Sequence, residues 1–178
     1  LLDEGSTHIP LATISSEIAD KTITLMAPSK TFNLPGFGCS FAIISNPELR
    51  LRYKKACAGI VPDPPAMGFT LAEAAYRHGE PWRQRLLHYL RANRNLALSR
   101  LGAIPGLFPF PVSATYLLWI DARGLAVENP QKFFEEAGVG LSDGADFGSP
   151  GFLRLNLGCT RALLEQALDR MEQAVGAR

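Results

Sequence analysis

The sequence predicts an α/β protein in which helices pack on a small sheet. From Gly68 onward the hydrophobic patterns run in the order helix, strand, helix, strand, strand, helix, which describes helices layered on strands. The composition is 47% hydrophobic and 20% charged, as in ordinary globular proteins. The 178 residues suffice for one domain, or for a small domain with part of another, and a core of that size requires neither disulfides nor a metal.

Charge and residue usage exclude several classes of function. The 18 Lys and Arg residues balance 17 Asp and Glu residues, for a formal net charge of +1, whereas a nucleic-acid binder needs a clustered basic surface. The apolar runs are too short to span a membrane, and no signal peptide opens the chain. The odd number of cysteines, without a CxxC pair, indicates reduced thiols, and the histidines lack metal-ligand spacing. We therefore expect a cytoplasmic protein that binds no nucleic acid, membrane or metal.

The first part of the chain predicts a short helical turn at residues 15–19, followed by two strands and a helix. Residues 22–26 (TITLM) are β-branched and apolar and predict a buried strand, and residues 39–45 (CSFAIIS) predict a second one. The loop between them is rich in Pro, Gly and Ser. Asn46 is a typical N-cap with Pro47 at the first helical position, so a helix should begin there.

The middle of the chain combines a linker signal with a helix signal. Residues 59–68 (GIVPDPPAMG) hold three prolines and two glycines, which favour a linker or domain boundary. Thr70 and Glu73 form a T-x-x-E capping box that should open a long helical stretch to about Leu101. The glycine and proline in residues 79–81 should break or kink that stretch.

The last part predicts a strand and a helix, then a short strand at residues 139–141, and finally another strand and a helix. Residues 114–121 (ATYLLWID) carry large side chains on both faces, as a central strand does. The Asn-Pro pair at 129–130 begins a helix that Gly138 ends. Residues 152–157 (FLRLNL) predict another strand, and Thr160 caps a final helix with apolar residues at helical spacing.

Lys30 is the first candidate for chemistry. It follows a predicted buried strand directly, with Ser29 and Thr31 beside it. A lysine held at a strand end among apolar neighbours loses solvation, which favours the neutral amine that acts as a nucleophile or base. On spacing alone, a solvated loop lysine is the simpler interpretation.

The sequence around Lys30 resembles a known cofactor site. TLMAPSKTFNLPGF is similar to the cofactor-lysine segment of fold-type I pyridoxal-phosphate enzymes, the aspartate aminotransferase superfamily. The resemblance runs through nearly the whole chain and is strongest to the class I/II aminotransferase-like C–S lyases of the cystathionine β-lyase group. The strings that carry it are HIPLATIS, TITLMAPSKTFN, CSFAIISNPELR, YRHGEPWRQRLLHYLRANR, SATYLLWIDAR, EEAGVGLSDGADFG and GFLRLNLGCTRALLEQAL.

The resemblance implies roles for three residues. Lys30 would bind pyridoxal phosphate covalently, and Ser29 could donate a hydrogen bond to the cofactor phosphate. Arg154, in FLRLNLGC, matches the arginine that holds the substrate α-carboxylate, which a planar guanidinium meets with two parallel hydrogen bonds. Taken alone, Arg154 is more simply a surface residue or part of a structural ion pair. Many superfamily members place a phosphate-binding serine and arginine where this chain has Ala27 and Gly38, and the missing arginine is typical of the lyase branch.

Family members are about double this length, which implies a division of the chain. Residues 1–58 would be the end of the large cofactor-binding domain, 59–68 a linker, and 69–178 the C-terminal small domain. The chain would then be the C-terminal portion of the pyridoxal-phosphate-dependent transferase fold. The absent half would carry the phosphate-binding turn, the ring stacked on the cofactor and the aspartate paired with the pyridine nitrogen. The segment with Ser142, Asp143 and Asp146 resembles a mobile entrance loop, to which we assign no chemistry.

The function implied is a carbon–sulfur β-lyase that depends on pyridoxal phosphate. It would act on sulfur amino acids such as cystathionine and release a thiol, pyruvate and ammonia, although the truncated chain would be inactive alone. One alternative is a class I/II aminotransferase. Another is a non-catalytic fragment that binds a partner or dimerises, because superfamily enzymes are homodimers and a truncated large domain exposes apolar surface.

Overall fold

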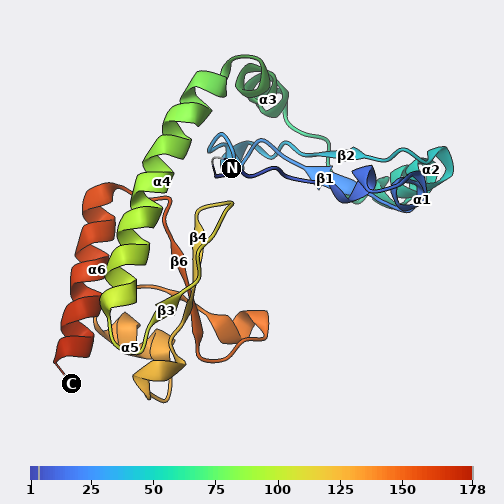
Figure 1. Cartoon of the computed structure of the whole chain (residues 1–178). Coiled ribbons are helices and arrows are strands. Elements are labelled where there is room, and N and C mark those ends of the chain that lie inside the picture. Colours follow the sequence, from blue (N-terminus) through green and yellow to red (C-terminus); the bar gives the residue numbers. More distant parts are fainter. Residues whose placement is uncertain (4, 178) are drawn as a thin grey trace. The chain divides into compact units, whose positions relative to one another are not determined.

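The computed structural model describes residues 1–3 and 5–177, and its contacts divide the chain into two units (Figure 1). One unit comprises Thr7–Arg85, and the other combines Leu1–Ser6 with Leu86–Arg178. We refer to them as the lysine unit and the sheet unit, because the first holds Lys30 and the second holds a four-stranded sheet.

The division between the units does not fall in the proline-rich segment 59–68. Helix α3 (Ala66–His78), which begins in that segment, packs against the turn that contains Phe32, whose ring lies 5.7 Å from that of Tyr76. Both sides of the proline-rich segment therefore belong to one unit. The assignment of residues 1–58 and 69–178 to the large and small domains of a longer protein stays a prediction.

The lysine unit consists of short strands and helices. Strands β1 and β2 pair antiparallel, with Leu25 opposite Ala42. The helix predicted at Asn46 is confirmed, because its side-chain oxygen accepts hydrogen bonds from the backbone N–H groups of Glu48 and Leu49. The elements of this unit are α1 (Ser16–Asp20), β1 (Thr24–Met26), β2 (Phe41–Ile43), α2 (Pro47–Cys57) and α3, with 3-10 helices at Leu11–Thr13 and Pro35–Phe37.

The prediction of a buried strand at residues 22–26 is correct in place and wrong in burial. Leu25 is 66% exposed and Met26 47% exposed, and Ile43 on the partner strand is 52% exposed. None of the described residues buries these three side chains, although the neighbouring Phe41 ring lies 6.1 Å from that of Tyr76. The apolar sequence therefore indicates a strand that this chain alone does not bury.

The capping box predicted at Thr70 is also wrong. Helix α3 begins at Ala66, directly after Pro65, whose extended backbone takes the N-cap position. Thr70 therefore lies inside the helix, where its hydroxyl donates to the Ala66 carbonyl at 3.2 Å. The predicted break at 79–81 is confirmed, because α3 ends at His78, Gly79 is its C-cap and α4 (Glu80–Ala103) begins at the next residue.

The sheet unit contains four antiparallel strands in the order β3-β4-β6-β5. Strand β4 lies between two others, as predicted for a central strand, and Leu118 pairs with Leu155 across the β4–β6 ladder. The predicted N-caps Asn129 and Thr160 are confirmed by their hydrogen bonds. The elements after α4 are β3 (Phe108–Pro109), β4 (Leu117–Asp121), 3-10 helix η3 (Arg123–Leu125), α5 (Pro130–Glu136), β5 (Ser142–Asp143), 3-10 helix η4 (Gly144–Phe147), β6 (Phe152–Asn156) and α6 (Arg161–Gly176).

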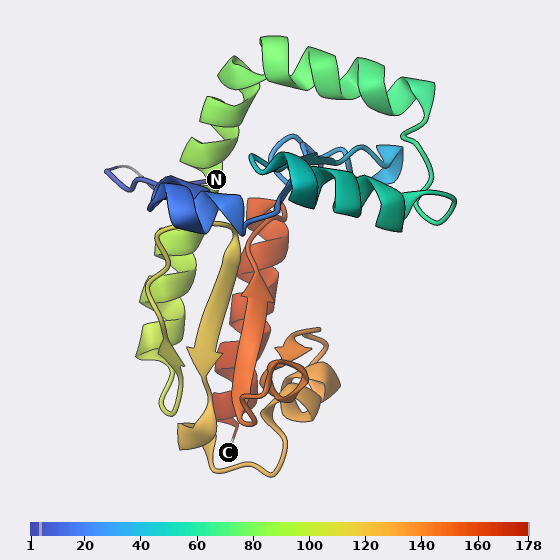
Figure 2. The same ribbon diagram turned by 90° about the vertical axis from the view of Figure 1, so that its right-hand side faces the viewer.

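Helices α4 and α6 cover one face of this sheet (Figure 2). Alternate residues of the two central strands are buried against them, which follows from the two-residue period of a strand. The largest buried side chains of this core are Leu101, Leu118, Ile120, Phe134, Leu153, Leu164, Leu168 and Met171. The intervening residues, Trp119 and Arg154 among them, therefore lie on the opposite face, which we call the open face.

Candidate functional site

Lys30 lies in a turn directly after β1, as the sequence predicts. Two backbone hydrogen bonds close this turn, from Phe32 to the Pro28 carbonyl and from Leu34 to the Ser29 carbonyl, each 2.9 Å. Lys30 is exposed and Ser29 is half-buried. The apolar enclosure predicted for Lys30 is therefore wrong for this chain, because the strand before it is itself uncovered.

Phe32 anchors the lysine turn on helix α3. Its ring packs edge to face on Tyr76, and burial raises the pKa of the Tyr76 hydroxyl, with a smaller contribution from Cys39. A Cβ added at Gly79 would lie 2.6 Å from the Phe32 ring, so this approach requires a glycine. The position of Lys30 is thus fixed by backbone hydrogen bonds and by the packing of the half-buried Phe32 ring two residues away.

Arg154 lies on the open face of the sheet unit. It pairs with Trp119 on β4 and with Ser142 on β5 in the strand register. Its Nη2 donates to the Ser142 Oγ at 3.1 Å, and its Cζ lies 4.5 Å from the ring centroid of Phe147. The side chain is half-buried, and its strand position holds it on a rigid element.

Arg154 has no carboxylate partner among the described residues. In the same unit, Arg100 binds Glu172 at 2.6 Å and Asp169 at 2.7 Å, and Arg123 binds Asp121 at 2.7 Å. A guanidinium offers five N–H donors, and the Arg154 group gives one of them to Ser142. The remaining donors on a half-buried cation suit an anionic ligand, and a carboxylate matches their planar arrangement.

Aromatic rings surround this cation on the open face. Trp119 stacks on Phe152 at 5.8 Å and meets Phe147 edge to face at 5.9 Å. Apolar rings beside a charged group displace water and strengthen its electrostatic interactions. Ser142 and Phe147 were missed as functional residues because their places depend on the pairing of β5 with β6.

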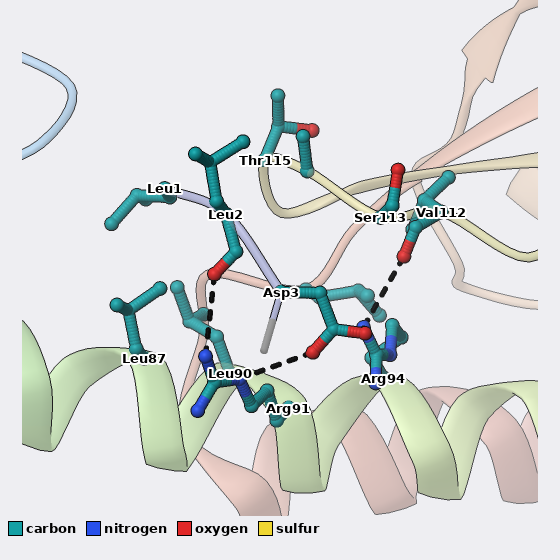
Figure 3. Close-up of a pocket in the computed structure, with 12 residues that line it drawn as sticks. Leu1, Leu2, Asp3, Leu87, Leu90, Arg91, Arg94, Val112, Ser113 and Thr115 are labelled. Atoms are coloured by element: carbon teal, nitrogen blue, oxygen red, sulfur yellow. Dashed lines mark hydrogen bonds and ion pairs between the residues drawn. The ribbon is translucent and has the colours of Figure 1, made fainter. Parts of the chain in front are cut away.

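A second cluster of charges, at the start of the chain, is structural. The Asp3 carboxylate binds Arg94 at 2.6 Å and Arg91 at 3.1 Å (Figure 3). The backbone of the same segment pairs with residues 113–115 through a bridge between Leu2 and Ala114. The adjoining pocket encloses about 20 Å³, enough for about one water molecule. This cluster therefore anchors the first residues on α4 and offers no room for an amino acid or cofactor.

Lys30 and Ser29 belong to the lysine unit, whereas Arg154 belongs to the sheet unit. Among the described residues, no group of His, Cys, Asp and Glu has the arrangement of a metal site. A search of the same residues finds no helix long and apolar enough to span a membrane. The chemistry available is therefore an exposed primary amine, a neighbouring hydroxyl and a separate guanidinium suited to a carboxylate.

Comparisons with known proteins place this chain in a family. Residues 4–171 match the family described as aminotransferase class I and II. Cystathionine beta-lyase PatB of Bacillus subtilis (strain 168) is 36% identical over 182 residues, which cover 96% of this chain and 46% of PatB. The crystal structure of OvoB superposes with a TM-score of 0.97 at 47% identity, covering 99% of this chain and 47% of OvoB. Cystalysin from Treponema denticola, whose structure contains a pyridoxal 5'-phosphate cofactor, superposes with a TM-score of 0.93 at 30% identity, covering 99% of this chain and 47% of cystalysin.

The chain spans about half the length of these relatives. That it corresponds to their C-terminal portion stays a prediction. The predicted fold class is confirmed, because the superposition on a pyridoxal-phosphate enzyme covers nearly every residue of this α/β chain. Since the family match extends over residues 4–171 of 178, the chain belongs to the aminotransferase class I and II family.

Proposed function

We propose that this chain supplies Lys30 and Arg154 to a pyridoxal-phosphate-dependent carbon–sulfur β-lyase. The substrates would be sulfur amino acids such as cystathionine, and the products a thiol, pyruvate and ammonia. The observation that carries the proposal is the half-buried Arg154 guanidinium, which lacks an acidic partner among the described residues. The name of PatB, a cystathionine β-lyase, supports the lyase branch.

The residues around Lys30 fit one end of the cofactor. The exposed Lys30 amine can bond to the cofactor aldehyde, and the half-buried Ser29 hydroxyl next to it can donate to the phosphate. At position 38 the chain has a glycine in the left-handed conformation, with φ +56°, where the resemblance implies a phosphate-binding arginine in many superfamily members. Lys30 therefore suits the cofactor aldehyde, and Ser29 suits only part of the hydrogen bonding that the phosphate requires. When bound, pyridoxal phosphate supplies an electron sink for the carbanion at the substrate Cα.

The two named residues divide the work on the substrate. Arg154 binds the α-carboxylate through its free N–H donors, which fixes the direction of the Cα–H bond. Binding of the substrate amine would release the Lys30 amine from its bond to the aldehyde, and the freed Lys30 Nζ would accept the proton from Cα as a general base. The Cβ–S bond then breaks, its electron pair leaves with sulfur, and a proton converts the thiolate to a thiol. Hydrolysis of the remaining unsaturated amine gives pyruvate and ammonia.

Borohydride reduction in the presence of pyridoxal phosphate tests the role of Lys30. We expect a phosphopyridoxyl adduct confined to the peptide that contains Lys30, and no such adduct in the Lys30→Ala variant. Lys21→Ala is the matched control, because Lys21 is an exposed lysine of the same unit that is ion-paired with Glu17 at 2.7 Å. Labelling spread over Lys21, Lys54 and Lys55 would contradict the assignment. The reduction is carried out on this chain and on the chain extended to the full family length.

An aminotransferase is the second candidate, because the matching family includes that activity by its description. The two reactions share the loss of the Cα proton and differ in the fate of the resulting carbanion. Amino-group exchange that depends on a keto acid, without release of pyruvate or thiol from cystathionine, would favour the aminotransferase.

A partner-binding module is the third candidate, and the apolar surface of the lysine unit favours it. Ile9, Leu25 and Ile60 are exposed, Ile60 to 79%. Exposed apolar surface of this kind promotes association, and a homodimer is the proposed form. Sedimentation that finds only a monomer would count against it.

The three cysteines are free thiols, in keeping with a proposed cytoplasmic location.

A further inference from the structure

The segment from Ser142 to Phe147 touches the Arg154 guanidinium at two points. Ser142 contributes its hydroxyl oxygen, and Phe147 contributes the face of its ring. We propose that Ser142 and Phe147 are positioning residues, which hold this guanidinium in the orientation that receives a carboxylate. The proposal rests on the proposed function for the identity of the ligand and on the structure for the positioning.

The first contact follows from strand register. Strand β5 pairs with the edge of β6 so that Ser142 lies directly opposite Arg154. The Ser142 Oγ, half-buried on the same open face, accepts a hydrogen bond from Nη2 at 3.1 Å. Since the acceptor is neutral, it orients the guanidinium and leaves its positive charge unbalanced for an incoming anion.

The second contact follows from the short helix η4. The Asp143 side chain accepts a hydrogen bond from the Ala145 backbone N–H at 2.9 Å, which starts the turn. Gly144 packs so closely that an added Cβ would lie 2.6 Å from the Phe152 carbonyl oxygen on β6. The turn is thus seated on β6, and Phe147 at its end lies with its ring 4.5 Å from the Arg154 Cζ.

The two contacts leave the rest of the guanidinium available. The ring of Phe147 covers one face of the cation, and Ser142 takes one N–H donor. Arginine has several rotatable bonds, and a ligand that must order them binds more weakly than one that meets an ordered group. Because the folded segment fixes the orientation of Arg154 in advance, the carboxylate binds a guanidinium that is already ordered.

Two measurements on this chain test the positioning. The first is nitrogen-15 NMR of the Arg154 guanidinium, assigned with Arg154→Lys, which reports how fast the group rotates and exchanges its protons. The second is titration with acetate at constant ionic strength, followed by the fluorescence of Trp119. The chain has two tryptophans, so Trp82→Phe leaves Trp119 as the sole reporter, and its ring meets that of Phe147 edge to face at 5.9 Å.

We expect Ser142→Ala and Phe147→Leu each to speed the motion of the guanidinium. Each should also weaken acetate binding roughly two- to tenfold, the factor that corresponds to ordering one flexible side chain. Ser142→Thr and Phe147→Tyr, which retain the hydroxyl and the ring, should restore both readouts. Ser149→Ala, two residues beyond this segment, is the control and should change neither.

The outcomes separate this proposal from the proposed function. Unchanged guanidinium motion and unchanged acetate affinity in both variants would overturn the positioning roles, even if Lys30 is labelled selectively. Conversely, faster motion and weaker acetate binding would support the positioning roles even if Lys30 is not labelled. If Ser142→Ala or Phe147→Leu unfolds the chain, circular dichroism detects the unfolding. The test then rests on Ser142→Thr and Phe147→Tyr, which should retain the guanidinium motion and the acetate affinity of the original chain.

Discussion

Replacing Asn93 with alanine should destabilise the sheet unit through the loop that connects β6 to α6. Asn93 is on α4, and its side chain is fully buried. Its Nδ2 donates to the carbonyls of Leu157 at 3.0 Å and Cys159 at 3.1 Å, and its Oδ1 accepts from Arg161 Nε at 2.8 Å. Three hydrogen bonds thus join one buried amide to both ends of the loop after the strand of Arg154.

The magnitude depends on the groups that alanine leaves without a partner. The Leu157 carbonyl is buried and loses its donor, which costs about 1–3 kcal/mol. The Cys159 and Arg161 groups are half-buried and can reach water, so each loses only the net value of a hydrogen bond, about 0.5–1.5 kcal/mol. Alanine regains roughly 0.5 kcal/mol from its higher helix propensity. We therefore expect a loss of about 1.5–5.5 kcal/mol in the free energy of unfolding.

Urea unfolding followed by far-ultraviolet circular dichroism measures this change. Asn95→Ala is the matched control, because Asn95 is exposed on the same helix and accepts hydrogen bonds only from its neighbour Arg94. Both variants gain the same helix propensity, so their difference isolates the buried bonds. The control should stay within about 0.5 kcal/mol of the original chain. A loss at Asn93 that equals the control, or stays below about 1 kcal/mol, would refute the reasoning.

Three further predictions concern the same unit. Thr160→Ala should cost about 1 kcal/mol in urea unfolding, because the Thr160 side chain caps α6 at the Leu163 N–H, and Thr160→Ser should restore most of it. Gly144→Ala should destabilise the chain by about 1–3 kcal/mol, because the added Cβ would collide with the carbonyls of Ser149 and Phe152. Gly140→Ala is the control and should be nearly neutral, because the space around Gly140 is open. Equal effects of the two variants in urea unfolding would contradict the close packing of η4. Arg100 holds the pKa of Glu172 below its usual value by a hydrogen bond, so this ion pair adds stability above the unfolded-state pKa and loses it as the pH falls. Melting temperatures between about pH 5 and pH 3 should therefore fall more steeply for the original chain than for Glu172→Gln. The corresponding difference in the free energy of unfolding should be less than about 1 kcal/mol, because both partners are partly exposed. Parallel curves of melting temperature against pH would refute the coupling.

Sequence reasoning worked where the cause is local. Asn46, Asn129 and Thr160 were correctly identified as helix caps, because each acts on backbone N–H groups two or three residues further along the chain. The same reasoning failed at Thr70, because the helix is capped by Pro65, five residues earlier. The burial of β1 could not be predicted either, because it depends on which other layers cover the strand.

Some residues of the candidate site could likewise be predicted from the sequence, whereas others depend on tertiary structure. Lys30 and Arg154 stand in strings that can be recognised without a structure, and the alternation in FLRLNL already places Arg154 on the face opposite Leu153 and Leu155. Ser142 and Phe147 also stand in a recognisable string, EEAGVGLSDGADFG, but nothing in that string indicates contact with Arg154. They meet Arg154 only because β5 takes one register on β6 and because Gly144 lets η4 approach that strand.

The position of Lys30 and its enclosure have different physical sources. Its position is encoded within the chain, by the backbone bonds from Phe32 and Leu34 and by the packing of Phe32 on α3. Its enclosure is not, since the strand before it is exposed. A layer packed on the exposed apolar side chains of β1 and β2 would bury them and would also exclude water from the amine. It follows that the selective labelling of Lys30 by pyridoxal phosphate and borohydride should increase in a chain that is extended to include this layer. The backbone conformation of the turn should stay the same.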